Sequence, residues 1–199
     1  MIEPLLLTAA NILTFKQQLP LTNASGFFFE RDERLFLTTS RHVLVDEPTG
    51  HYPNRLEIER SALPETTVYR AFTPDHLHSP SDTVEAGTPI LIVGFPLSFH
   101  DSPHHMPVVR HAVVASSFGL RFQGQGYFLT DARTHRGTSG SPVVMRVSES
   151  NPKLGDLPWM ALGVRSTRID LGSRDLVLDE ALGLNCAWYA DIILTLTSD

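Results

Sequence analysis

The chain contains a single cysteine, Cys186, among 199 residues. One cysteine cannot form a disulfide within the chain, and it cannot build a zinc site that needs several cysteines. The fold therefore does not depend on an oxidising compartment. We expect Cys186 to be a buried and inert thiol, because no cysteine-based catalytic motif surrounds it.

Long hydrophobic runs are also missing. No stretch approaches the roughly 18 apolar residues that a membrane-spanning helix needs. The first residues include Glu3 and lack the basic residues that open a secretory signal peptide. We therefore expect a cytoplasmic protein that has no membrane partner.

An excess of basic residues is absent as well. Sixteen Lys and Arg stand against 22 Asp and Glu, which gives a net charge of −6. Such a chain has no overall electrostatic attraction to nucleic acid, so we do not expect a nucleic-acid partner. Hydrophobic residues make up 42% of the chain and charged residues 19%, which is typical of a folded protein with a sizeable core.

Short apolar segments separated by glycine and proline predict a mainly β fold, either a barrel or a sandwich. A charged turn at 30–34 predicts a hairpin between strands at 27–29 and 35–39. Helical composition is confined to the two ends, so we expect short helices at 5–19 and 188–196. Further strands are expected at 56–59, 88–95, 108–116, 126–130, 142–147 and 159–166.

Two segments carry residues that are typical of nucleophilic catalysis. His42 follows a predicted strand, and Ser139 lies between Gly137 and Gly140. Because these glycines have no side chain, the turn can expose the Ser139 hydroxyl. A serine hydroxyl needs a base to accept its proton, and His42 is a candidate base. The N–H groups of Gly137 and Ser139 can point at one spot, as an oxyanion hole requires.

These segments resemble the trypsin-like serine peptidases of chymotrypsin fold, and in particular their disulfide-free bacterial and intracellular members. The matching motifs occur in the family's order: Ser-Gly-Phe at 25–27, Thr-Ser-Arg-His-Val at 39–43, Gly-Phe-Pro at 94–96 and Gly-Thr-Ser-Gly-Ser-Pro at 137–142. The order of His42 before Ser139 also matches this family. The resemblance implies a mainly β fold of two antiparallel β-barrels, with short helices at both ends and the active site between the barrels.

The resemblance also implies an organisation and a reaction. Residues 1–22 would form an N-terminal helix, residues 23–86 the first barrel with His42, and residues 87–199 the second barrel with Ser139 and a C-terminal helix. The chain would be a serine endopeptidase that cleaves peptides or proteins through an acyl-enzyme on Ser139, without a cofactor or a metal. Domains of this kind also occur beside partner proteins in stress or defence systems, which makes such a partner a further expectation.

Several residues of a substrate pocket are implied by the same resemblance. Arg133 and Thr134 fall at its base and wall, and Ser166 borders it. Arg165 adds a second cation, and a cationic pocket with hydroxyl groups favours an acidic side chain of the substrate. Asp131 is expected to support the loop and not to contact substrate.

Thr138 stands where zymogen-type members of the family have an aspartate that pairs with a newly cut N-terminus. A threonine cannot form that salt bridge. We therefore expect the turn around Ser139 to be ordered without proteolytic activation.

The aspartate that completes the family's catalytic triad has no counterpart in the expected interval between His42 and Gly94. Asp46 is too close to His42 in the chain, and neither Asp75 nor Asp82 lies beside an apolar strand. We expect a first barrel that is shortened by the piece carrying this acid. Three explanations are open: the natural protein has a segment that this sequence omits, the chain uses another acid or a His–Ser dyad, or it is a pseudoenzyme.

Two functions other than peptide hydrolysis also stay open. A catalytically impaired pseudoenzyme would use the cleft between the barrels to bind peptide or protein partners. His100, His104 and His105 form a histidine-rich segment that would suit a metal-binding domain. The Ser-Pro pair between these histidines favours a loop over a metal site.

Overall fold

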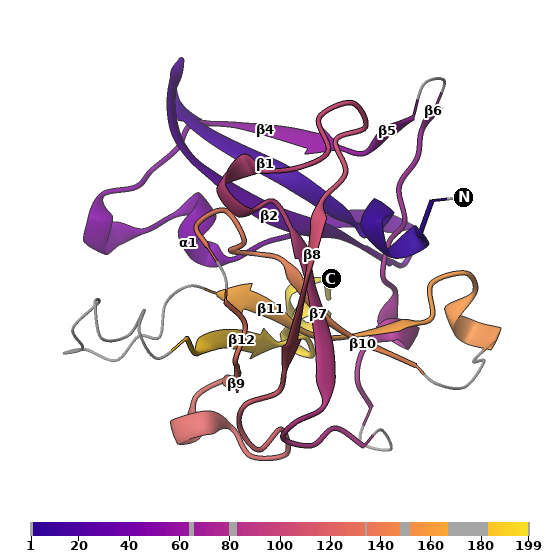
Figure 1. The fold of residues 1–199 in the computed structure, drawn as a ribbon. Helices are drawn as coiled ribbons and strands as arrows, with labels where there is room; N and C mark the ends of the chain where they lie inside the picture. Colours follow the sequence, from indigo (N-terminus) through magenta and orange to yellow (C-terminus); the bar gives the residue numbers. More distant parts are fainter. Residues whose placement is uncertain are drawn as a thin grey trace.

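The computed structural model describes residues 2–63, 66–79, 83–133, 135–147, 152–166 and 183–198. Two curled antiparallel sheets dominate this part of the chain, and the helices are short (Figure 1). The sequence predicts this mainly β architecture of two antiparallel lobes, and the structure confirms it.

The first sheet has four strands in the order β3-β2-β1-β4. Their bounds are Ala9–Lys16 for β1, Leu19–Arg31 for β2, Arg34–Thr38 for β3 and Arg55–Arg60 for β4. The predicted hairpin is confirmed, because β2 and β3 pair through a two-residue turn. Asp32 and Glu33 in this turn both have positive φ, which matches the right-handed twist of paired strands.

The second sheet has six strands in the order β8-β7-β10-β11-β12-β9. Their bounds are Pro89–Gly94 for β7, Val108–Val113 for β8, Tyr127–Thr130 for β9, Pro142–Arg146 for β10, Trp159–Ser166 for β11 and Asn185–Tyr189 for β12. A separate ribbon pairs β5 (Ala62–Leu63) with β6 (Thr66–Thr67). The first sheet is thus the smaller one, in agreement with a shortened first lobe.

In the residues that the structure describes, two short α-helices and several 3-10 turns connect the strands. The α-helices are α1 (Arg41–Leu44) and α3 (Ile192–Leu196). The 3-10 turns are η1 (Pro4–Thr8), η2 (Glu47–Thr49), η3 (Pro74–His76), η4 (Pro96–Ser98), η5 (Phe122–Gly124) and η6 (Pro152–Leu154). Within the described ranges, none of the helices has the length and apolar character needed to cross a bilayer.

The N-terminal helix predicted over 5–19 is wrong for most of its length. Only η1 is helical, and β1 follows it directly. β1 pairs with β2 on one side and with β4 on the other, so distant partners override the helical composition of this segment. The C-terminal helix likewise starts only at Ile192, because Trp188 pairs in the sheet with Val164 and Tyr127.

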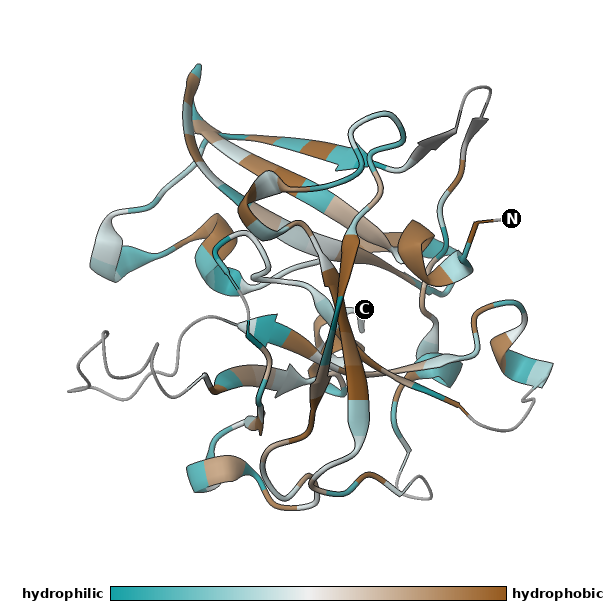
Figure 2. Cartoon of the chain, in the orientation of Figure 1, coloured by the Kyte–Doolittle hydropathy of each residue, from teal (hydrophilic) through white to brown (hydrophobic). Residues whose placement is uncertain are grey.

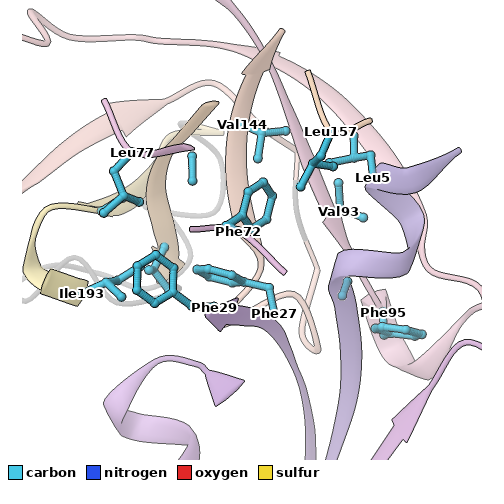
Figure 3. Packing of buried hydrophobic residues seen from close by; sticks show 14 residues of the cluster. Leu5, Phe27, Phe29, Phe72, Leu77, Val93, Phe95, Val144, Leu157 and Ile193 are labelled. Carbon is cyan, nitrogen blue, oxygen red and sulfur yellow. The ribbon is translucent and has the colours of Figure 1, made fainter. Parts of the chain in front are cut away.

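Aromatic side chains from β2 anchor a core that both sheets share. Phe27 and Phe29 alternate onto one face of β2 and are fully buried. The ring of Phe27 meets that of Phe72 edge to face, with centroids 5.7 Å apart. Figure 3 shows these rings beside Val93 of β7 and Val144 of β10. Figure 2 shows that β7, the strand that carries Val93, is largely apolar. The two sheets are therefore held together by one apolar cluster.

Candidate active site

The predicted base, His42, lies on the single turn of α1, which follows strand β3 (Figure 1). Ser40 is the extended residue before this turn, and a 2.9 Å bond from the Val45 N–H to the Arg41 carbonyl closes it. His42 is half-buried and lines a cavity of about 560 Å³. Strand β3 therefore ends a few residues before His42, at one side of this cavity.

The predicted nucleophile, Ser139, lies in a tight turn before β10. Gly137 and Gly140 have φ values of +94° and +87°, which side chains rarely tolerate. A Cβ atom on Gly140 would lie 2.1 Å from the carbonyl oxygen of Ser25, so the turn packs directly against the first sheet. Ser139 is only 6% exposed, which makes the turn more closed than the sequence predicts.

Ser25 of β2 connects this turn to the first sheet. Its hydroxyl donates to the Gly137 carbonyl at 2.7 Å and accepts the Phe95 N–H at 2.9 Å. Its own N–H donates to the Ser139 carbonyl at 2.9 Å. Ser25 is fully buried, so water competes little with these three bonds.

The turn is ordered by hydrogen bonds within the chain. The hydroxyl of Thr138 donates to the His135 carbonyl at 2.8 Å, and the Leu97 N–H donates to the Arg136 carbonyl at 2.7 Å. Together with Ser25, these donors occupy three successive carbonyl groups. The threonine before Ser139 thus takes part in an ordered turn, and the independence of this turn from proteolytic activation stays a prediction.

One carbonyl oxygen connects the histidine segment with the serine segment. The carbonyl of Arg165 in β11 accepts the Ser40 hydroxyl at 2.8 Å and the Gly140 N–H at 2.8 Å. Ser40 lies two residues before His42, and Gly140 follows Ser139 directly. The segments of both predicted catalytic residues therefore bond to the same atom, although they come from different sheets.

The side chain of Arg165 is buried, with 1% of its surface exposed. Its guanidinium donates to the Asn185 side-chain oxygen at 2.9 Å, and the Asn185 amide donates to the Ala132 carbonyl. Burial lowers the pKa of Arg165 to about 9, and the nearby Cys186 thiol opposes this shift. Asn185 therefore connects the buried Arg165 cation to Ala132, which lies in the segment before Ser139.

The other predicted pocket residues have different surroundings. Ser166 is buried and lines the same cavity as His42. Arg133 is exposed, and Thr134 lies outside the described residues. The carboxylate of Asp131 accepts the Val113 N–H at 2.7 Å, so Asp131 supports the loop as predicted.

The histidine-rich segment forms pairs of side chains. The rings of His100 and His105 stack with centroids 5.4 Å apart, and His104 lies 2.6 Å from the Asp101 carboxylate. In the part of the chain that the structure describes, no group of three or more His, Cys, Asp or Glu side chains could hold a metal ion. The metal-binding interpretation therefore gains no support from these residues.

Two residues that shape the site are not singled out by the sequence. Ser40 carries only a weak signal, a hydroxyl directly before the Arg-His pair at the end of a strand. Asn185 carries no local signal, because its partner Arg165 lies 20 residues away.

Solved structures of proteases share this fold. An inactive serine-to-alanine mutant of Rv3671c from M. tuberculosis H37Rv is 13% identical, with a TM-score of 0.54, and the match covers 97% of this chain and 88% of that chain. An inactive form of the Rv3671c protease is 15% identical, with a TM-score of 0.54 and coverage of 97% and 90%. No protein-family model and no curated protein matches the chain. At such low identity the likeness shows the fold, so the chain has the two-lobed β fold of the trypsin-like serine peptidases.

Proposed function

We propose that the chain is a serine endopeptidase, with Ser139 as the nucleophile and His42 as its general base and then general acid. The observation that carries this proposal is the Arg165 carbonyl, which accepts hydrogen bonds from both catalytic segments. The solved proteins that share this fold with the chain are also proteases. Peptides or proteins are therefore the proposed substrates.

In the proposed reaction, His42 accepts the proton of Ser139 while the serine oxygen attacks the scissile carbonyl. The N–H groups of Gly137 and Ser139 stabilise the negative oxygen of the tetrahedral intermediate. His42 then gives its proton to the leaving amine, which leaves an acyl-enzyme on Ser139. A water molecule that loses a proton to His42 hydrolyses this ester, and the mechanism uses no cofactor.

As the sequence resemblance implies, we assign the residue before the cleaved bond to Arg133, Thr134, Arg165 and Ser166, of which Ser166 lines the cavity beside His42 and Thr134 lies outside the described residues. The buried cation of Arg165 favours an acidic side chain there, because charge-assisted hydrogen bonds to a carboxylate are strong in a site with little water. Substrates with Glu or Asp at this position are therefore expected to react fastest.

The pseudoenzyme alternative is favoured by one observation, the 6% exposure of Ser139. A nearly buried serine needs local opening before a peptide carbonyl can reach it. A chain that does not open would bind peptides without cleaving them.

Hydrolysis of a quenched fluorescent peptide library separates the two functions. The unchanged chain is expected to cleave peptides, and Ser139→Ala and His42→Ala are each expected to lower kcat by roughly 10⁴-fold or more. Ser198→Ala, at an exposed serine far along the chain, is the matched control and should keep full activity. Cleavage that persists in Ser139→Ala would contradict the proposal, and peptide binding without cleavage by the unchanged chain would favour the pseudoenzyme.

A further inference from the structure

The first sheet ends in two edge strands that differ in character. β4, at one edge, carries four charged residues among its six: Arg55, Glu57, Glu59 and Arg60. Charges of this kind keep an exposed edge from pairing with other chains. β3, at the other edge, has one charged and three apolar residues. Among the described residues, no strand pairs with β3 on the side away from β2, so β3 is the edge that is open to another strand.

The register of the hairpin determines which backbone groups of β3 face the open side. In a hairpin with a two-residue turn, the pair that flanks the turn exchanges both of its hydrogen bonds. Bonding then alternates along the strand, so Phe36 and Thr38 also bond to β2. The N–H and carbonyl groups of Leu35 and Leu37 therefore point away from β2. Groups that recur at every second residue are matched by the backbone of an extended peptide.

The end of β3 leads to the cavity beside His42. Thr38 is the last residue of β3, and it also lines this cavity of about 560 Å³. Sites that bind ligands usually have about 300–1,000 Å³, so the cavity has room for a large side chain. The second lobe gives it an apolar wall, formed by Val164, Trp188, Ile192, Ile193 and Leu196. Of the described residues, those of the turn around Ser139 do not line it.

The alternation of side chains connects the open edge with the cavity. Neighbouring side chains of a strand point to opposite faces, and directly paired residues share a face. Leu35 and Leu37 thus lie on one face of the sheet, and Thr38 lies on the other, where it lines the cavity. A strand added to β3 therefore places one side chain beside Thr38 at the cavity and the next beside Leu37. Leu35 is 46% exposed and Leu37 is half-buried, so the added strand meets apolar groups on both faces.

A second copy of this chain does not fit as the occupant. On the face that meets the cavity, its own β3 offers Arg34 and Phe36 as large side chains. Arg34 is charged, and Phe36 already packs against the core that both sheets share. Its β4 is mostly charged. The occupant that fits is an extended segment of another protein, with a large apolar side chain at alternate positions.

We propose that β3 is a docking edge for such a segment of a partner protein. The segment pairs with the backbone of Leu35 and Leu37 and inserts one large apolar side chain into the cavity beside His42. Binding of this kind needs no catalysis, so the inference goes beyond the proposed peptidase function and does not depend on it.

Binding of the peptide acetyl-Lys-Val-Thr-Phe-Thr-Val-Lys-amide tests the pairing. Trp159→Phe leaves Trp188 of the cavity wall as the only tryptophan, and its fluorescence reports binding. Alternate N–H groups of a strand face opposite edges, so methylating one alternating set of peptide nitrogens should weaken binding by about tenfold or more. Methylating the other set should have little effect. Equal effects of the two sets, or no change of fluorescence up to millimolar peptide, would overturn the proposal.

A variant of the edge strand tests the same pairing from the protein side. Leu35→Pro removes an N–H that faces the open edge and none that bonds to β2, so the chain should fold but bind the peptide about tenfold or more weakly. Leu35→Ala keeps this N–H and is the matched control, which should lose much less affinity. Urea unfolding checks that both variants fold. Unchanged binding by Leu35→Pro would refute the docking edge.

Two further results separate this inference from the alternatives. A dimer of the chain alone that Leu35→Pro dissociates, seen by analytical ultracentrifugation, would make a second copy the occupant and overturn the proposal. A chain that cleaves no peptide but binds the probe with the expected effect of methylation would refute the peptidase proposal and support the docking edge.

Discussion

The hydroxyl of Ser40 donates a 2.8 Å hydrogen bond to the carbonyl oxygen of Arg165. The same oxygen accepts the Gly140 N–H, and a carbonyl oxygen has two lone pairs for two donors. The turn that carries His42 and the turn that carries Ser139 therefore share one atom of β11 as a common support. Small changes at this atom should alter the position of one catalytic segment relative to the other.

Ser40→Ala is expected to separate activity from stability. The substitution removes one buried hydrogen bond but leaves the Arg165 carbonyl with the Gly140 N–H as its partner, so the free energy of unfolding should fall by only about 1 kcal/mol. The residue directly before the His42 turn loses its connection to β11, so kcat should fall by about tenfold or more. Urea unfolding and peptide hydrolysis measure the two effects. Equal kcat values for the variant and the parent chain would show that this bond does not position His42.

Gly140→Ala is expected to disrupt the turn at Ser139. The new Cβ would lie 2.1 Å from the Ser25 carbonyl oxygen and 2.2 Å from the Thr39 hydroxyl, and φ is +87°. Backbone strain and overlap together should lower the free energy of unfolding by about 3 kcal/mol or more. Gly87→Ala is the matched control, because Gly87 has φ of +90° but nothing within 4 Å of its Cβ position. Similar losses in both variants would mean that the close packing of Gly140 contributes little.

Replacement of the buried cation should change which peptides react. Arg165→Gln is expected to lower kcat/KM for substrates with Glu before the cleaved bond by about 10- to 100-fold, because a charge-assisted hydrogen bond is lost. For the matching Gln substrate the change should be small. Arg133→Gln, at an exposed position, is the control and should change the preference less. If Arg165→Gln slows the Glu and Gln substrates equally, Arg165 does not recognise charge.

His76 is expected to make the fold sensitive to acid. It is buried in η3, where its Nδ1 accepts the Thr73 N–H at 3.1 Å, and burial lowers the pKa of His76. The unfolded chain therefore binds a proton near pH 6.5, while the folded chain resists it. The contribution of His76 to stability is present above this pH and is lost as the pH falls towards the lowered pKa.

Urea unfolding of the parent chain and of His76→Gln measures this contribution. The experiment covers about pH 5 to 8, the range in which a histidine usually titrates. The parent chain should lose stability more steeply below about pH 6.5 than the variant. Parallel curves for the two proteins would contradict a neutral, buried His76.

The sequence predicts elements well where the local pattern decides them. The hairpin of β2 and β3 has apolar strands around a charged turn, and Asp32 and Glu33 adopt the positive φ that such a turn needs. Strand β1 is not predictable in this way. Its strand state depends on pairing with β4, which lies about 40 residues away, and its own composition favours a helix.

The candidate site likewise has some features that local motifs predict and others that depend on distant contacts. His42 and Ser139 are found from short motifs, and the special φ of Gly137 and Gly140 follows from their place in the turn. The bond from Ser40 to Arg165 spans 125 residues, so no local pattern contains it.

Reaction of the folded chain with a fluorophosphonate probe, followed by intact mass spectrometry and peptide mapping, tests the central claim most directly. The account predicts one adduct per chain, located on Ser139, that is absent from Ser139→Ala and from the urea-unfolded chain. No adduct on the folded parent chain, or an adduct that persists in Ser139→Ala, would contradict an activated serine at this position.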